Sequence, residues 1–354
     1  MGTTLKQIAE IAQVSRGTVD RVIHGRYGVD PKTRARVLKV IMDLDYNPNI
    51  MAKALRGMQT PFKIGAIVPS ARNPFFNAIN QGIVQAARDA EPYGMEVIRL
   101  EMQEATPEHQ AECIDRLQQA GVCGIMLVPI DDALVRDRIN ALPSSIPVIT
   151  FNSDIGDTKR LCFVGNDHVR AGQVAAQMMS VVMPGPGRVA TLISSRDMRA
   201  HMERIEGFVR FFRSERKDDV EVIGPFSVYE RESDAYDMVR SLLNSVEGLT
   251  GIYVAGGGQQ SAARALAESG LAGRVHMICH DLLPETIEFV RRRIVDFTIG
   301  QEAFVQGYYP VMLFRNYHMF GRSPERERYL TRIDIRSRLN LDYDGVHEMN
   351  DRFR

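Results

Sequence analysis

The chain of 354 residues lacks the features that mark several common classes of protein. It contains no run of about 18 apolar residues, so we expect no membrane span and no membrane partner. The amino-terminal segment has no apolar signal sequence, which favours a cytoplasmic location. The cysteines are widely spaced and form no metal-ligand or redox pattern, so we expect reduced thiols, no bound metal and no cofactor. They are Cys113, Cys123, Cys162 and Cys279.

The sequence motifs of common enzymes are also missing. The chain has no Gly-x-Ser-x-Gly, no His-Glu-x-x-His, no Walker sequence and no metal-spaced set of histidines and cysteines. We therefore expect a protein without catalytic residues.

The net charge is zero, with 44 basic and 44 acidic residues, but the two kinds of charge are unevenly distributed. Up to residue 61 the chain carries ten Lys and Arg against five Asp and Glu, a local excess of +5. A small basic module on a more acidic body is typical of a DNA-binding head joined to a sensing domain. A chance excess on a solvated surface would give the same count.

The first 23 residues predict two short helices joined by a tight turn. Thr4 and Gln7 form a capping-box pattern, and Ser15 can cap a second helix, so the break falls at residues 13–14. This pattern describes a helix-turn-helix, whose second helix enters the DNA major groove, although any two-helix corner shares it. Val19 and Val22 are expected to face the small core. The predicted DNA contacts are Thr4, Ser15, Arg16, Gly17, Thr18, Asp20 and Arg21.

Four fragments in a fixed order then resemble one known family. They are Thr18-Val19-Asp20-Arg21-Val22, Tyr46-Asn47-Pro48-Asn49, Ala52-Lys53-Ala54-Leu55 and Ile64-Gly65. A third helix that begins at Asp30-Pro31 separates the first fragment from the second. In this order the fragments resemble the headpiece and hinge of the lactose-repressor (LacI-type) family of transcription regulators.

The resemblance implies a headpiece over residues 1–48 and a hinge helix with its linker over residues 49–61. The hinge would become helical on specific DNA and insert Leu55 into the minor groove. Where most family members have Ser, this chain has Asp20, which either accepts a bond from a cytosine amine or pairs with Arg21; we favour the pairing. The implied DNA contacts of the hinge are Asn49, Ala52, Lys53, Leu55 and Arg56.

From residue 62 onward short apolar runs alternate with amphipathic stretches, which predicts an α/β fold of two doubly wound parallel sheets. Strands are expected at residues 64–68, 96–100, 124–128, 147–151, 188–193, 220–223, 251–255, 275–279 and 296–299. Helices are expected at residues 79–90, 108–120, 134–141, 169–182, 202–213, 234–246, 261–268 and 285–293.

The same resemblance covers this region, which is similar to a periplasmic-binding-protein core of the ribose-binding type. It implies an effector-binding core over residues 62–354, with the chain crossing between two subdomains near Gly165, Ile294 and Arg322. The first subdomain would comprise residues 62–164 and 295–321, and the second residues 165–294 and 322–354. A small-molecule effector would bind in the cleft between them and alter the DNA affinity of a homodimer.

The family motifs imply a set of effector contacts, each with an ordinary alternative. Phe76 can simply fill the base of a helix, Arg204 can form a surface ion pair, and Asp167 can cap the helix that follows it. The implied contacts are Asn73, Phe75, Phe76, Asn152, Ser153, Asp167, Arg204, Asp281 and Gln301.

Two departures from the ribose-type pattern bear on the effector. Asn152-Ser153 stands where that pattern has an Asp-Arg pair, and the chain reads Ala255-Gly256-Gly257-Gly258 where the pattern has Asn-Asp. We therefore expect a sugar, polyol or cyclitol other than ribose. The expected function is a transcriptional regulator that acts as a repressor.

The alternatives are a non-regulatory sugar-binding protein, which the headpiece argues against, and a sugar-processing enzyme. His168, His201 and His280 leave the enzyme open, because they lie near predicted strand ends or on helices that face the cleft.

Overall fold

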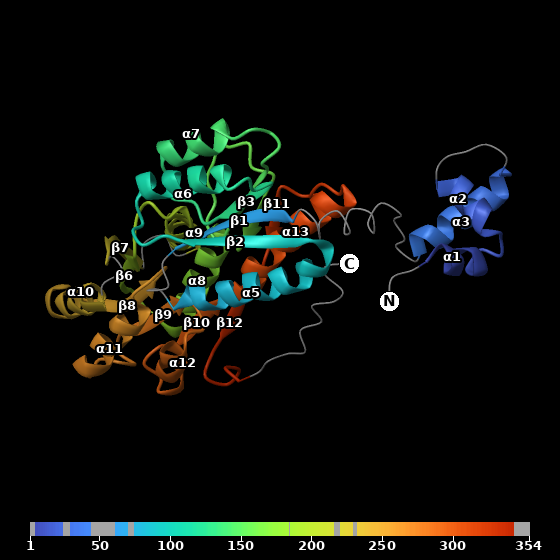
Figure 1. Ribbon diagram of the computed structural model, residues 1–354. Coiled ribbons are helices and arrows are strands. Elements are labelled where there is room, and N and C mark those ends of the chain that lie inside the picture. The colour runs from blue at the N-terminus through green and yellow to red at the C-terminus, as the bar shows by residue number, and fades with distance from the viewer. Residues whose placement is uncertain are drawn as a thin grey trace.

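The computed structural model describes residues 4–23, 29–43, 61–69, 74–183, 185–215, 220–228 and 232–342 (Figure 1). The amino-terminal unit consists of three helices, which lie to one side of the other elements in Figure 1. They enclose a small core in which Ile8, Val19 and Val37 are fully buried, as the apolar spacing predicts. These helices are α1 (Leu5–Ile11), α2 (Arg16–Ile23) and α3 (Pro31–Asp43).

Side chains at the helix ends explain where this unit turns. Thr4 and Gln7 make the predicted capping box, with each side chain accepting a bond from the other residue's backbone N–H. Gln13 adopts a left-handed backbone conformation, with φ of 51°, in the turn after α1. Ser15 Oγ then accepts a bond from Thr18 N–H at 3.1 Å at the start of α2. Asp30 caps α3 in the same way.

The first sheet of the core has six strands in the order β11-β5-β4-β3-β1-β2, and all its pairs are parallel. Helices α5 (Phe75–Ala90) and α13 (Ala303–Phe320) cover one face. Helices α6 (Pro107–Gln119) and α7 (Ala133–Ala141) cover the other, and a short 3-10 helix, η1 (Glu91–Tyr93), follows α5. The strands are β1 (Phe62–Val68), β2 (Met95–Glu101), β3 (Gly124–Leu127), β4 (Val148–Phe151), β5 (Cys162–Gly165) and β11 (Arg328–Leu330).

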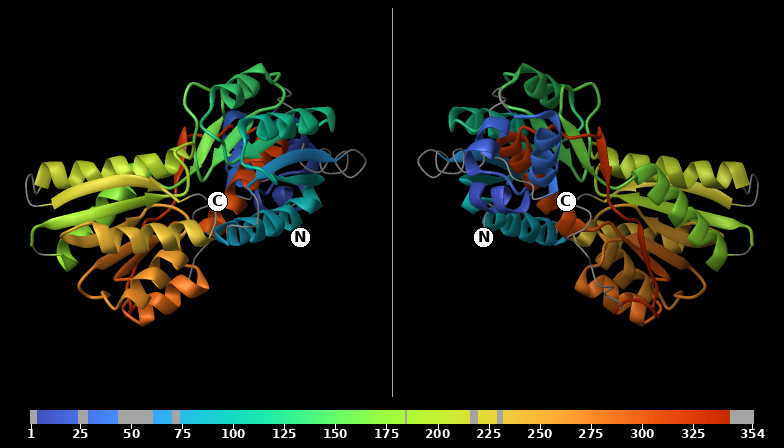
Figure 2. Two further views of the ribbon diagram at one scale, coloured as in Figure 1. Left: turned by 90° about the vertical axis from the view of Figure 1, so that its left-hand side faces the viewer. Right: turned by 90° about the vertical axis from the view of Figure 1, so that its right-hand side faces the viewer.

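The second sheet has the order β12-β10-β9-β8-β6-β7 and is parallel except for β12, which runs antiparallel to β10. Helices α8 (His168–Val182) and α9 (Arg199–Glu215) cover one face. The other face carries α10 (Glu232–Ser245), α11 (Gln259–Ser269) and α12 (Pro284–Arg291). Figure 2 shows the two sheets as separate lobes. The strands are β6 (Gly187–Ile193), β7 (Val220–Ser227), β8 (Leu249–Val254), β9 (His276–His280), β10 (Phe297–Gly300) and β12 (Asp334–Arg336).

Strand pairing corrects two of the three expected crossings between the lobes. The first agrees with the expectation, because β5 ends at Gly165 in the first sheet and α8 packs in the second lobe. The second crossing follows Gly300, not Ile294, because β10 pairs in parallel with β9. The third lies between Leu330 and Asp334, not at Arg322, because β11 pairs with β5 in the first sheet.

Each lobe contains a pair of helices in near backbone contact. A Cβ atom at Gly82 of α5 would lie 2.1 Å from the carbonyl oxygen of Phe304 in α13. A Cβ atom at Gly172 of α8 would lie 2.0 Å from the carbonyl oxygen of Arg204 in α9. Only glycine allows this approach, so Gly82 lets α5 pack closely against α13 and Gly172 lets α8 pack closely against α9.

Within the described residues, no helix has both the length and the apolar character needed to cross a bilayer.

The first prediction concerns the contact between α5 and α13. We expect Gly307→Ala to lower the free energy of unfolding by about 1–3 kcal/mol, because the new Cβ atom would meet a backbone oxygen. That oxygen, the carbonyl oxygen of Ile79, would lie 2.0 Å away. Chemical denaturation measures the change. Gly185→Ala is the control, since nothing lies within 4 Å of its added atom; equal stability of the two variants would contradict the packing argument.

Candidate functional site

A cavity of about 310 Å³ lies between the lobes, at the carboxyl ends of their strands. Parallel strands of both sheets point toward it, as expected for a binding site in this class of fold. The first lobe contributes Pro69, Phe75, Phe76, Met102, Ala105, Val128, Ile130 and Asn152, and the remaining lining residues are Ser194, Ser195, Asp197, Met198, Ala200, His201, Arg204, Gly256, Gly257, Asp281 and Gln301.

Most of the predicted effector contacts meet in this lining, although two that the structure describes do not. Six of them line the cavity: Phe75, Phe76, Asn152, Arg204, Asp281 and Gln301. Ser153 is buried outside the lining, where its Oγ accepts a bond from Ala200 N–H at 3.3 Å. Asp167 also lies outside the lining and caps α8 by accepting from Arg170 N–H at 3.0 Å. Asn73 falls outside the described residues.

A buried chain of hydrogen bonds joins three of these residues. Arg204, only 2% exposed, donates from Nη2 to Gln301 Oε1 at 2.9 Å. Gln301 in turn donates from Nε2 to Asp281 Oδ1 at 2.7 Å. The Nη1 group of Arg204 is held by the carbonyl oxygen of Ala255 at 2.6 Å, whereas its Nε has no protein partner. The Gln301 amide thus bridges the Arg204 cation and the Asp281 carboxylate, and both of these charged residues line the cavity.

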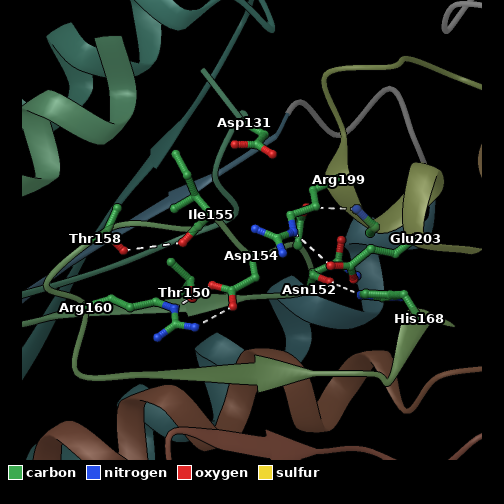
Figure 3. Close-up of polar contacts among 12 residues, drawn as sticks. Asp131, Thr150, Asn152, Asp154, Ile155, Thr158, Arg160, His168, Arg199 and Glu203 are labelled. Atoms are coloured by element: carbon green, nitrogen blue, oxygen red, sulfur yellow. Dashed lines mark hydrogen bonds and ion pairs between the residues drawn. The ribbon is translucent and has the colours of Figure 1, made fainter. Parts of the chain in front are cut away.

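A second set of amides connects this chain to the first lobe. Asn152, which follows β4, donates from Nδ2 to Gln306 Oε1 at 3.0 Å. Gln306 donates to the backbone oxygen of Gln301 at 2.6 Å. The carbonyl oxygen of Asn152 lies 2.7 Å from His168 Nε2, and both residues appear in Figure 3. Asn152 and Asp281 have φ angles of 62° and 77°, a conformation that Asn and Asp tolerate better than most residues.

Burial determines the charge states of the site. It lowers the pKa of Arg204 and raises the pKa of Asp281, while the Arg204 charge opposes the rise at Asp281. Burial and the Arg204 charge lower the pKa of His201 to about 3. The same causes hold the pKa values of His168 and His280 well below their usual range. All three imidazoles are therefore neutral at pH 7.

The loop between β6 and α9 supplies lining residues that the motifs did not indicate. Ser194 Oγ lies 3.3 Å from His201 Nδ1, and a Cβ atom at Gly256 would lie 2.1 Å from His201 Nε2. Gly256 therefore leaves space for the His201 imidazole, a role that the sequence of the glycine run does not indicate. In the sequence, only the expected position of His201 near the cleft suggested that it could line the site.

The same loop also contacts the first lobe directly. Asp131 N–H donates to the carbonyl oxygen of Asp197 at 3.0 Å. Arg199 pairs with Glu203 at 2.8 Å, and its pKa is raised first by Glu203 and then by the nearby Asp131 and Asp154 of the other lobe. Figure 3 shows Arg199 and Glu203 beside Asp131 and Asp154. The lobes thus meet along one edge of the cavity.

The amino-terminal unit exposes the residues predicted to contact DNA. Arg16, Gly17 and Arg21 of α2 are exposed, while Val19 and Val22 are buried as predicted. Thr4 and Ser15 are exposed caps, and Thr18 and Asp20 are partly buried. The predicted hinge contacts Asn49, Ala52, Lys53, Leu55 and Arg56 lie outside the described residues.

Among the described residues, no group of three or more His, Cys, Asp and Glu side chains is placed to hold a metal ion.

Comparison with known families identifies both parts of the chain. Residues 64–321 match the family described as a periplasmic binding protein domain. Residues 4–49 match the bacterial regulatory proteins of the lacI family. The fold and the cleft are therefore those of a periplasmic-binding-protein core, which confirms the predicted α/β fold class. The chain therefore belongs to the periplasmic-binding-protein family in its core and carries a lacI-family DNA-binding domain at its amino terminus, as its motifs suggested.

Its relatives include named transcription regulators. The chain is 28% identical over 181 residues to catabolite control protein A of Staphylococcus epidermidis, covering 51% of this chain and 52% of that protein. It is 28% identical over 277 residues to the HTH-type transcriptional regulator CelR of Thermobifida fusca, covering 75% and 78%. The chain thus spans about half the length of the first relative and about three quarters of the second.

A solved structure of the XylFII molecule shares the core fold. It has a TM-score of 0.70 and 27% sequence identity, and the match covers 78% of this chain and 98% of that one.

The second prediction follows from the neutral imidazoles. Unfolded histidine binds a proton near pH 6.5 and the buried imidazoles do not, so the unfolded state binds more protons as the pH falls. Stability should therefore decrease from pH 7 to pH 5. For His201, with its pKa of about 3, the loss is about 2 kcal/mol. Denaturation at both pH values measures the loss, and His201→Gln should reduce it; an unchanged pH dependence in this variant would contradict the assignment.

Proposed function

We propose that the chain is a DNA-binding transcriptional regulator, acting as a repressor, whose operator affinity changes when a sugar, polyol or cyclitol binds between the lobes. The observation that carries this proposal is the presence of two sites in one chain. One is a helix-turn-helix with exposed Arg16 and Arg21, and the other is a cavity with a buried, neutralised Arg204–Gln301–Asp281 chain. The regulators among its relatives support the same function.

In the proposed division, residues 1–48 form the headpiece, 49–61 the hinge and 62–354 the effector-binding core. We propose that a homodimer in the cytoplasm places two copies of α2 over two half-sites of double-stranded operator DNA. Arg16 and Gly17 begin the recognition helix and would select the sequence, while Arg21 would bond a guanine edge or a phosphate. The proposed contacts of the hinge helix are Asn49, Ala52, Lys53, Leu55 and Arg56.

In the cavity, Arg204 would donate to neighbouring ligand oxygens and Asp281 would accept from hydroxyls, with Phe75 packing against the ring. A ligand that contacts both lobes favours the arrangement in which they meet, because it binds only there with all its contacts. The change in lobe geometry would reach the headpieces through residues 49–61.

We propose no catalytic role for the cavity. His201 is the histidine in its lining, and with a pKa of about 3 it is a weak base for general base catalysis near neutral pH.

The third prediction tests DNA binding. Arg21→Ala should weaken binding of the full chain to operator DNA by about tenfold or more, because a guanidinium contact to a base or phosphate is worth about 1–3 kcal/mol. Fluorescence anisotropy at fixed salt measures the affinity. Arg274→Ala removes the same charge from an exposed site in the core and should leave the affinity nearly unchanged. If both substitutions weaken DNA binding equally, Arg21 contributes only its positive charge and makes no specific contact with the DNA.

The fourth prediction tests the cavity by a thermal-shift screen of sugars, polyols and cyclitols. A ligand at 100 times its Kd should stabilise the core by about 2.7 kcal/mol. Arg204→Met should abolish the shift, whereas Arg210→Met on the exposed side of the same helix should preserve it. Arg204→Met combined with Asp281→Asn avoids an unpaired buried carboxylate and keeps the test valid if the single variant unfolds. A shift that survives in both Arg204 variants would place the ligand elsewhere.

A further inference from the structure

The two sides of the cavity differ sharply in chemistry. The side of the cavity formed by the first lobe is apolar. Apart from Asn152, all the described lining side chains of this lobe are apolar. Among them, Met102, Val128 and Ile130 lie in loops after strands, and each is at most 4% exposed. They follow β2 and β3, where the loops of this lobe reach the cavity. We call these three residues the apolar wall.

Most backbone groups of the apolar wall are already hydrogen-bonded within the first lobe. The amide of Gln110, a fully buried residue of α6, donates to the carbonyl oxygen of Val128 at 2.9 Å and accepts from Ile130 N–H at 2.8 Å. Val128 N–H donates to Ile67, and Met102 N–H to the carbonyl oxygen of Val68 at 2.9 Å. A ligand hydroxyl pressed against this wall would therefore lose its water without gaining a partner, which is unfavourable.

The opposite side presents the hydrogen-bonding groups. Arg204, Asp281 and Gln301 lie there, each at most 7% exposed, and Ser194 and His201 lie beside them. The charges of Arg204 and Asp281 balance each other, the imidazole adds none, and Asp197 at the exposed edge of the lining is a further acid that disfavours an anion. An anionic ligand would find no additional buried cation among these residues, so the site favours an uncharged ligand.

We propose that the effector is an uncharged polyol with hydroxyls on one side and an alkyl group on the other, of the kind found in 6-deoxy sugars. Its methyl group would pack on the apolar wall while its hydroxyls bond Arg204, Asp281 and Gln301. This proposal rests on the proposed function, because it specifies the ligand of the same cavity.

Calorimetric titration of the full chain with matched sugars tests the proposal. Each 6-deoxy sugar of the gluco, galacto and manno series, in both D and L forms, is compared with its parent hexose. Among the pairs that bind, the 6-deoxy member should bind about 10- to 100-fold more tightly, which is the discrimination that an apolar pocket achieves against an added hydroxyl. If the parent hexoses bind as tightly as the 6-deoxy sugars or more tightly, the 6-deoxy sugar proposal is wrong. The proposed sugar-responsive regulator would not be affected by this result. If no pair binds, the 6-deoxy sugar proposal fails, whereas the proposed function fails only if the thermal-shift screen of sugars, polyols and cyclitols is also silent.

The same Val→Thr substitution at two positions tests whether the apolar wall causes the preference for the 6-deoxy sugar. Val128→Thr adds a hydroxyl at nearly constant volume and should narrow the preference for the 6-deoxy sugar by about tenfold, since the parent hydroxyl gains a partner. Val148→Thr makes the same change in β4, at a residue that is 2% exposed and outside the cavity lining, and should leave the preference unchanged. Equal preferences in the two variants would overturn the role of the wall.

Discussion

The cavity between the lobes depends on one constraint, the burial of the Arg204 guanidinium. A buried cation is tolerated only when it is paired and hydrogen-bonded, and Arg204 meets this condition through segments far apart in the sequence. Gln301 follows β10, Asp281 follows β9, and the carbonyl oxygen of Ala255 follows β8. The position of Arg204 itself requires Gly172, whose missing side chain allows α8 to contact its backbone. This half of the cavity therefore depends on packing among several elements of the second lobe.

Gln301 also gives this network its connection to the first lobe. It stands where the chain crosses between the lobes, and its backbone oxygen accepts from Gln306, which bonds Asn152. A ligand that rearranges the bonds of Gln301 would act directly on this crossing between the lobes. In the proposed regulator, an uncharged ligand could shift the lobes without introducing a charge into the cleft, and a coupling energy of about 1–3 kcal/mol to the DNA site would suffice.

The sequence predicted the parts of this structure that have a periodic or local signal. The helix-turn-helix, the two parallel sheets and six of the cavity residues belong to this group, because caps, alternation and family motifs are readable along the chain. Helix α13 was not predicted because it is apolar on nearly all sides and shows no amphipathic period. Strand β11 was not predicted because only its pairing with β5 defines it as a strand. The apolar wall and the packing of His201 against Gly256 depend on contacts between distant segments, which no local pattern encodes.

In the proposed regulator, ligand binding in the cleft controls the DNA affinity of the amino-terminal unit. The most direct test is the Kd of the full chain for operator DNA selected from a random pool, measured with and without a saturating ligand of the cavity. We predict that the ligand changes this Kd by about 5- to 150-fold in the natural chain and leaves it unchanged in Arg204→Met. An identical Kd with and without bound ligand in the natural chain would contradict the account.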